Sequence, residues 1–291
     1  MVTCKKEIII KALCFFLSAF LYSLNVPVAK FFLDDLSSTA LLFLLYLGSA
    51  LGMFFIILFK KNERSFKPKK EEIPFISGVI ICDVLAALLI VSSLKYLNAS
   101  TVSLLSIFEI AATIMASYLI FKSKVNKNMI ISLIAVTLGS IVLSIDPHSK
   151  YYFSLAVLLV IGASFLWGLE NNLTAKVSEN NPLLLVFYKC FFVALFNLIF
   201  ICFNNNILSI IINYWYLPII GFFTYGISIL CFAYSTKYIG ASKTSIIFSL
   251  SPIFSTALSL FIFKENVNIL FVIGLIFMII GMYFTINDNE K

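Results

Sequence analysis

Ten long apolar runs, separated by short polar connectors, account for most of the chain. The runs are 18 to 25 residues long and fall at 8–32, 39–59, 73–95, 99–121, 128–145, 153–175, 183–203, 214–236, 242–263 and 267–286. A helix rises 1.5 Å per residue, so each run is long enough to cross a hydrocarbon core about 30 Å thick. Lipid offers no partner for backbone groups, and the runs lack strand-type alternation, which favours helices over a barrel.

The composition agrees with this pattern and excludes a water-soluble domain. Hydrophobic residues make up 61% of the 291 residues and charged residues only 12%, and the mean hydropathy is +1.04. A soluble domain typically carries about 25% charged residues. So much apolar surface must face lipid, so we expect an all-α integral membrane protein whose lasting partner is the lipid bilayer.

The positive charges predict how the helices are oriented. The net charge is +7, and the basic residues lie in short connectors, where they set topology, so no nucleic-acid partner is expected. If the connector 60–72 is cytoplasmic, the cytoplasmic segments of a ten-span chain hold sixteen Lys and Arg and the opposite segments hold four. We therefore predict a multi-pass protein of a plasma membrane with both termini in the cytoplasm.

Two segments of the chain repeat each other. Residues 94–126 and 236–268 align without a gap at an offset of 142, with eleven of 33 positions identical. The identical polar pairs include Lys122 with Lys264 and Asn126 with Asn268, and such matches are less expected by chance than matches of Leu or Phe. The sequence therefore predicts two copies of one unit.

The copies extend to the preceding helices and imply an inversion. Asn25 aligns with Asn171 and Lys30 with Lys176 at an offset of 146. The expected units are 1–145 and 146–291, each with five helices. Because five helices cross the membrane an odd number of times, the second copy begins on the opposite side and is inverted in the membrane. Two inverted five-helix repeats are a transporter architecture, with the binding site at the repeat interface near the midplane.

Four charged residues lie near the middle of the predicted spans. Asp83 and Glu109 each lie about 15 Å into a helix, Glu170 about 12 Å and Lys189 about 10 Å. A charge there costs about 2.5–3.5 kcal/mol on insertion scales, so it usually faces a cavity or a partner. One hypothesis is a polar substrate site in which the acids exchange protons; the other is structural ion pairing, for example of Lys189 with an acid.

Aromatic and amide residues at similar depths extend this hypothesis, because an aromatic ring can stack on a ligand, and the alternative that the sequence favours is an interfacial or packing role. The candidate substrate-binding residues are Tyr22, Asn25, Asp83, Glu109, Trp167, Glu170, Asn171, Lys189 and Tyr225. Pro27 and Pro252 predict either a helix break at the site or a simple packing bend. Gly48 and Gly52 form a GxxxG motif, which predicts close helix packing or the contact of a homodimer.

Motifs for catalysis and for cofactors are missing from the sequence. His148 is the only histidine, and neither a zinc-protease, a nucleophile-elbow nor a P-loop pattern occurs. We therefore expect no enzyme activity, no cofactor and no metal.

The motifs resemble those of EamA-type transporters of the drug/metabolite transporter superfamily. The resemblance covers nearly the whole chain and rests on Trp167-Gly168 followed by Lys176, on Phe108-Glu109 opening an apolar run, and on LSPIFSTALSLFIFKE ending at Glu265. It implies a ten-helix fold around a central cavity and movement of small metabolites, amino acids or drugs, often outward.

The chain departs from the family pattern in copy one. Tyr46 stands where such proteins often carry a basic residue, Ile110 replaces a proline, and Ser123 replaces the terminal acid. The leading hypothesis is a secondary exporter working by alternating access. The alternatives are a lipid-linked sugar or nucleotide-sugar translocator, which would need more basic groups than Lys189, and a membrane sensor or enzyme.

Overall fold

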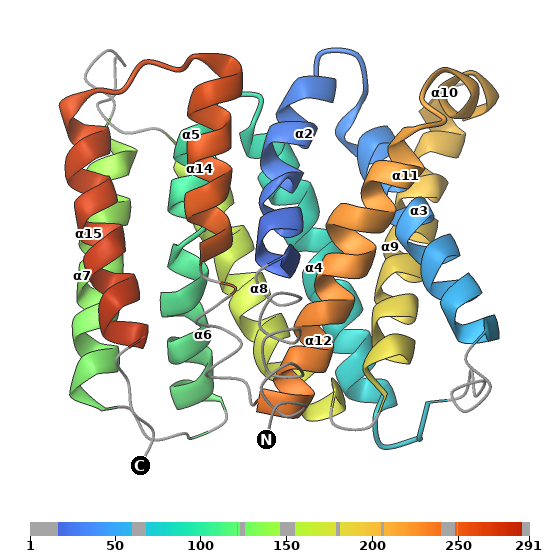
Figure 1. The fold of residues 1–291 in the computed structure, drawn as a ribbon, viewed down its shortest axis with the longest axis horizontal. Coiled ribbons are helices and arrows are strands. Elements are labelled where there is room, and N and C mark those ends of the chain that lie inside the picture. The colour runs from blue at the N-terminus through green and yellow to red at the C-terminus, as the bar shows by residue number, and fades with distance from the viewer. Residues whose placement is uncertain are drawn as a thin grey trace, which may run out of the picture. The chain divides into compact units, whose positions relative to one another are not determined.

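The computed structural model describes residues 17–59, 68–120, 122, 126–145, 155–178, 181–204, 207–239, 248 and 250–286. Every regular element in these ranges is a helix (Figure 1). The elements are α2 (Asn25–Phe32), α3 (Ser38–Phe59), α4 (Ile73–Ser93), α5 (Ala99–Leu105), α6 (Phe108–Leu119), α7 (Lys127–Ser144), α8 (Ala156–Ser178), α9 (Pro182–Asn204), α10 (Ile207–Asn213), α11 (Leu217–Gly221), the π-helix η2 (Phe222–Ile227), α12 (Ser228–Ile239), α14 (Leu250–Phe263) and α15 (Ile269–Ile286).

The helices follow the apolar runs closely, and the all-helical membrane character is confirmed. Wherever a run starts or ends within the described ranges, the helix boundary differs from it by at most three residues. Seven of the described helices are long and apolar enough to cross a membrane, and three shorter apolar helices cover Leu17–Phe32, Leu250–Phe263 and Ile269–Phe284. The beginnings of the first and ninth runs, 8–16 and 242–247, lie outside the described residues.

Three runs predicted as single helices are interrupted. The first leaves helical geometry at Leu24, three residues before Pro27, so Pro27 falls in the first turn of α2, where its missing N–H removes no helical hydrogen bond. The run that opens at 99 turns at Ser106 and Ile107 between α5 and α6, and the eighth run contains η2. Pro252 lies within α14.

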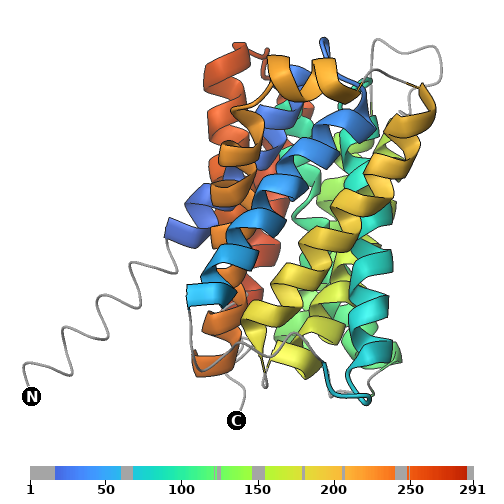
Figure 2. The same ribbon diagram turned by 90° about the vertical axis from the view of Figure 1, so that its right-hand side faces the viewer.

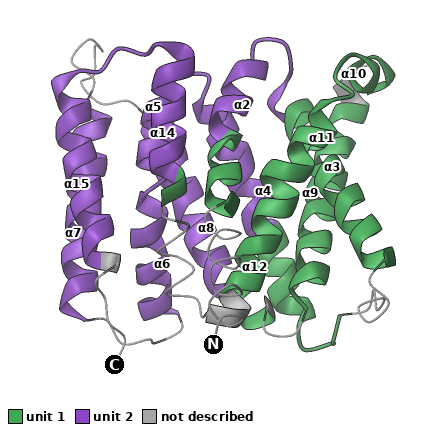
Figure 3. Cartoon of the chain, viewed as in Figure 1, with its two compact units in different colours: residues 1–25, 39–80, 174–251 green, residues 26–38, 81–173, 252–291 purple. Residues whose placement is uncertain are grey.

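The chain divides into two compact units, which are coloured separately in Figure 3. Unit 1 comprises residues 1–25, 39–80 and 174–251, and unit 2 comprises residues 26–38, 81–173 and 252–291. Each unit takes segments from both halves of the sequence. The division into repeats at residue 145 therefore concerns sequence similarity and stays a prediction.

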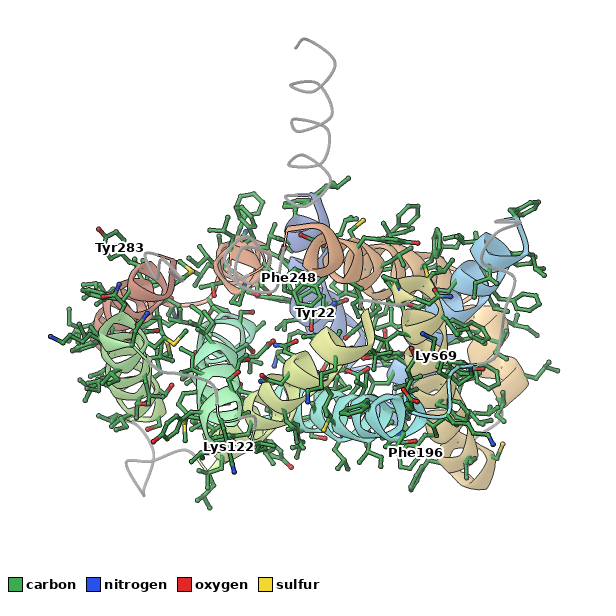
Figure 4. All side chains as sticks on the ribbon, turned by 90° about the horizontal axis from the view of Figure 1, so that it is seen from below. Tyr22, Lys69, Lys122, Phe196, Phe248 and Tyr283 are labelled. Atoms are coloured by element: carbon green, nitrogen blue, oxygen red, sulfur yellow. The ribbon has the colours of Figure 1, made fainter. Side chains whose placement is uncertain are left out.

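In unit 2, α7 and α15 pack side by side and run in opposite directions (Figure 1). A Cβ built on Gly139 would lie 3.2 Å from the carbonyl oxygen of Gly274, and one built on Gly281 would lie 3.1 Å from that of Ser132. Ser132 and Gly274 are themselves related by the offset of 142, so the contact is reciprocal, as across a two-fold axis. Tyr283 of α15, which is 60% exposed, points away from α7 (Figure 4).

The residues that immediately precede these two helices recur at the same offset. Lys122 and Lys264 are the non-glycine residues with positive φ in the described chain, at 53° and 50°. After each of them an asparagine caps the next helix: Asn126 Oδ1 accepts from the N–H of Met129 at 3.0 Å, and Asn268 Oδ1 accepts from the N–H of Phe271 at 2.7 Å. The aligned polar positions thus have equivalent local roles.

In unit 1, α3 packs directly on α11 and η2 through the GxxxG motif. A Cβ on Gly48 would lie 1.7 Å from the carbonyl oxygen of Pro218, and a Cβ on Gly52 would lie 1.9 Å from the ring of Phe222. Between them, Ser49 Oγ donates to the carbonyl of Gly221 at 2.7 Å. The motif is therefore occupied within the chain, so its role is helix packing, and a homodimer would need another surface.

A lysine counted among the topology charges has a second role in unit 2. Lys30 Nζ donates to the carbonyl oxygens of Leu94 at 2.5 Å and Leu97 at 3.3 Å, just beyond the last residue of α4. A positive charge is favourable at a helix C-terminus, where carbonyls lack helical partners. Lys30 therefore fastens α2 to the end of α4.

Candidate functional site

One face of α8 carries the main polar cluster of unit 2. Trp167 and Asn171 are four residues apart, so they lie on the same face of the helix. Trp167 Nε1 donates to Asp83 Oδ1 of α4 at 3.1 Å, and Asn171 Nδ2 donates to Glu109 Oε1 of α6 at 2.6 Å. Three helices thus present two carboxyl groups and their donors within about one helical turn of each other along α8.

A glycine permits this close arrangement. A Cβ built on Gly168 would lie 2.7 Å from the backbone C of Ala112 and the backbone N of Thr113, so α8 approaches the α6 backbone directly at this point. The neighbours on α8 then reach α6: Asn171 Nδ2 also lies 3.4 Å from Thr113 Oγ1. The Trp-Gly pair combines a donor for Asp83 with the small residue that brings the two helices together.

Three further residues belong to this network and were not among the site candidates. Asn172 Nδ2 donates to the carbonyls of Gly168 at 2.9 Å and Thr113 at 3.2 Å, and its Oδ1 accepts from Ser117 Oγ at 2.5 Å. The sequence did contain a signal, because Glu109, Thr113 and Ser117 follow each other at four-residue spacing and form a polar stripe along an apolar helix.

The acidic side chains of this region are largely withdrawn from solvent. Asp83 is 1% exposed and Glu170, next to Asn171 on α8, is 5% exposed, while Glu109 is half-buried. Charged side chains inside membrane-spanning helices usually face a cavity or a polar partner, which makes this network the candidate site.

Two predicted site residues of unit 1, Tyr22 and Tyr225, belong to an aromatic cluster. The ring centroids of Tyr22 and Tyr225 are 6.3 Å apart, those of Tyr46 and Tyr225 are 4.6 Å apart, and those of Tyr22 and Phe248 are 4.8 Å apart. Figure 4 shows Tyr22 and Phe248 next to each other. Asn25 Nδ2 lies 3.4 Å from the carbonyl oxygen of Thr224.

The π-helix η2 places Tyr225 in this cluster. A π-segment inserts into a longer helix and changes the register of the backbone bonds, and such insertions are frequent at functional sites. Side chains of neighbouring helices bind the carbonyls around it, because Ser49 donates to Gly221 O and Ser18 Oγ donates to Ser228 O at 2.8 Å. The hydropathy of the sequence gave no indication of this π-helix.

The nine predicted site residues therefore fall into two groups. Hydrogen bonds join Asp83 to Trp167 and Glu109 to Asn171, and an edge-to-face ring contact joins Tyr22 to Tyr225. Lys189 of α9, which is 7% exposed, belongs to unit 1 with Tyr22, Asn25 and Tyr225, whereas the three acids, Trp167 and Asn171 belong to unit 2. An ion pair of Lys189 with an acid stays a prediction.

Glu265, the terminal acid of the family-like motif, has a structural role in unit 2. Its Oε1 accepts from the N–H of Ala99 at 2.8 Å and its Oε2 from the N–H of Ser100 at 2.9 Å. These N–H groups begin α5 and have no helical partner, and a negative charge is favourable at a helix N-terminus. Glu265 thus caps a helix that is 166 residues away in the sequence.

Replacing Glu265 by alanine is expected to lower the stability of the protein. Loss of an N-terminal cap costs about 0.5–2 kcal/mol, and two charge-assisted bonds place this case toward the upper end. The melting temperature of purified protein in detergent measures the effect. Glu72→Ala is the matched control, because Glu72 accepts from the N–H of Lys69 at 3.0 Å at an exposed site only three residues away. Equal melting temperatures for both variants would contradict the assignment.

Comparisons with known proteins point to one family of membrane transporters. The model of the EamA-like transporter family matches residues 9–145 and again residues 154–287. A protein of Clostridium kluyveri described as an uncharacterized transporter is 25% identical over 257 residues, which are 81% of this chain and 81% of that protein. Another, from Methanothermobacter thermautotrophicus, is 24% identical over 233 residues, 77% of this chain and 67% of that protein.

The fold also has a counterpart among solved structures. A crystal structure that is 12% identical in sequence superposes with a TM-score of 0.70 and covers 97% of this chain and 98% of its own. At this identity the likeness concerns the fold alone. The family model covers most of the chain in two matches, so the resemblance noted from the motifs is confirmed: the chain is a multi-pass membrane protein that belongs to the EamA-like transporter family.

Proposed function

We propose that this protein is a secondary transporter that moves a small metabolite, amino acid or drug-like solute out of the cell by alternating access. The observation that carries the proposal is the polar network Asp83–Trp167 and Glu109–Asn171, held by three apolar helices. Carboxyl groups inside membrane helices are costly and mark substrate or proton pathways. The network supplies donors, acceptors and charge where a hydrophilic solute would otherwise meet hydrocarbon.

Acids inside the helices give the transporter a means of coupling to protons. If one of the acids Asp83, Glu109 and Glu170 exchanges a proton during the transport cycle, a substrate amine and that proton compete for the same carboxylate. The competing hypothesis, in which the acids serve structural ion pairs, predicts loss of folding on neutralisation rather than loss of transport. The two are separable by experiment.

Ten helices in two inverted repeats are the architecture we propose for this function. Supporting it, the seven long helices and the three shorter apolar ones together make ten. Further support comes from α7 and α15, which run antiparallel with reciprocal glycine contacts and carry equivalent caps 142 positions apart. Inverted repeats allow the inward-open and outward-open states to be exchanged conformations of the two copies.

Labelling from the two sides of the membrane tests this topology. In a chain whose native cysteines are replaced, Asn266→Cys is expected to react with an impermeant maleimide on intact cells, because Asn266 is exposed in the loop between α14 and α15. Ser65→Cys, in the lysine-rich connector, is expected to react only after permeabilisation. Reaction of both from the same side would exclude the inverted arrangement and the cytoplasmic termini.

Comparing the medium of cells with and without the protein tests the function itself. A small solute that accumulates outside only when the protein is present identifies the class of cargo and the direction. Uptake of that solute by proteoliposomes containing purified protein then shows direct transport, and repeating it with and without a pH gradient shows whether protons are coupled. A medium of unchanged composition together with inactive proteoliposomes would contradict the proposal.

A further inference from the structure

The connector between α9 and α11 has an unusual composition for a loop. Residues 204–216 contain no charged side chain and end in Tyr214, Trp215 and Tyr216. Part of this connector forms the short helix α10, which the apolar runs did not predict. No residue of α10 is buried, although five of its seven residues are Leu or Ile.

The side chains of α10 and the turn after it divide into three faces at about 100° per residue. Ile207, Ile210 and Tyr214 are half-buried and lie on one face. A second face carries Ser209 and Asn213, which form a hydrogen bond of 3.4 Å and are both exposed. A third face is apolar and exposed: Leu208 is 68%, Ile212 62% and Trp215 65% accessible.

The orientation of α10 relative to the neighbouring helices agrees with this division into faces. It appears end-on in Figure 1 and from the side at the top of Figure 2, where it lies across the ends of the neighbouring helices of its unit. Both neighbours expose apolar side chains beside it, since Ile199 and Phe200 near the end of α9 are 50% and 47% exposed and Ile219 of α11 is 52% exposed. Apolar side chains are thus exposed both on α10 and on the helices that precede and follow it.

We propose that α10 and the Tyr214–Tyr216 turn form an interfacial helix that lies in the plane of the bilayer surface. The apolar face with Leu208, Ile212 and Trp215 enters the boundary between headgroups and acyl chains, while Ser209 and Asn213 face water. Tryptophan and tyrosine prefer this boundary because one part of each ring system is apolar and the other can donate a hydrogen bond.

The partner implied by this chemistry is a bilayer surface of zwitterionic lipid, without selection of anionic headgroups. Interfacial helices that select anionic lipids carry lysine or arginine on the polar face, and residues 204–216 carry none. Because α9 and α11 hold both ends at the membrane, the helix does not need charge to stay there. Its depth should therefore not depend on the fraction of anionic lipid.

Fluorescence quenching by spin-labelled lipids tests the proposal, because Trp215 and Trp167 are the two tryptophans of the chain. The Trp167→Phe variant, reconstituted in phosphatidylcholine vesicles, reports Trp215 alone. We expect strong quenching by labels at the headgroup or at acyl position 5, clearly weaker quenching at position 12, and little quenching by aqueous iodide. The profile should stay the same when one third of the lipid is phosphatidylglycerol.

One further variant calibrates the depth of the tryptophan reporter in the bilayer, and a second keeps the test valid if the Trp167→Phe chain misfolds. In a chain lacking both native tryptophans, Phe191→Trp places the reporter at the tenth residue of α9, where the native side chain is 43% exposed, so deep labels should quench it most. If the Trp167→Phe chain is not monodisperse, the difference between wild type and Trp215→Phe gives the Trp215 signal. Quenching of Trp215 by iodide without lipid quenching, or strongest quenching at position 12, would overturn the proposal.

Discussion

Replacing Gly48 by alanine is expected to prevent the protein from folding. The added Cβ would lie 1.7 Å from the carbonyl oxygen and 2.5 Å from the Cα of Pro218. Both contacts are with backbone atoms, so no side-chain rotation relieves them, and α3 and α11 would have to separate. Overpacking costs about 1–3 kcal/mol and occasionally more, and separation would also break the bond from Ser49 to Gly221.

The yield of monodisperse protein in detergent and its melting temperature measure this effect. Gly162→Ala in α8 is the matched control, because its new Cβ would have only an ordinary contact, 3.5 Å from Leu89 Cδ1. Alanine in a helix interior is favoured over glycine by about 0.5–1 kcal/mol, so the control should be as stable as the wild type or more so. A Gly48→Ala protein with wild-type yield and melting temperature would disprove the close packing of α3 on α11.

Replacing Glu109 by glutamine is expected to remove transport while the protein stays folded. The amide oxygen of glutamine can still accept from Asn171, which donates to Glu109 at 2.6 Å, so the contact between α6 and α8 is kept. The variant loses the negative charge and the exchangeable proton. If the carboxyl group binds a cationic substrate or a coupled proton, transport by proteoliposomes should fall at least about tenfold, which corresponds to about 1.4 kcal/mol.

Asp83→Asn extends this test, and Glu72→Gln is its control. Asparagine at position 83 can still accept from Trp167, so its expected result is again a folded protein with impaired transport. Glu72 is an exposed acid that accepts from the N–H of Lys69, and its neutralisation should leave transport unchanged. Wild-type transport in both network variants would exclude the network as the site, and loss of folding in both would favour the structural ion-pair hypothesis.

Part of the site could be read from the sequence, since each charged residue stood out against an apolar run. The four-residue spacing of Trp167 and Asn171 also placed both on one face of α8. The sequence did not show which helix each would meet, because that depends on Gly168 bringing α8 to the backbone of α6. Thr113 and Ser117 were missed as site residues, since a hydroxyl in an apolar run is common and becomes informative only with its partner.

The role of Glu265 shows the same limit. The residue matched a family-like motif, but its function as a cap depends on Ala99 and Ser100, which lie far from it in the chain. A search for local capping patterns examines residues within one turn and cannot find a partner that folding brings from another helix.

The amino-acid sequence by itself determined that the chain spans a membrane as helices, where most of those helices begin and end, and which polar residues they carry. These properties follow from the transfer of each segment into lipid, a sum over neighbouring residues that needs no knowledge of the fold. Tertiary structure alone decided the break between α5 and α6, the π-segment at Tyr225, the packing of Gly48 and the pairing of Asp83 with Trp167. In lipid all apolar faces are alike, so helices select their neighbours through close backbone contacts and hydrogen bonds, which exist only once the helices have met.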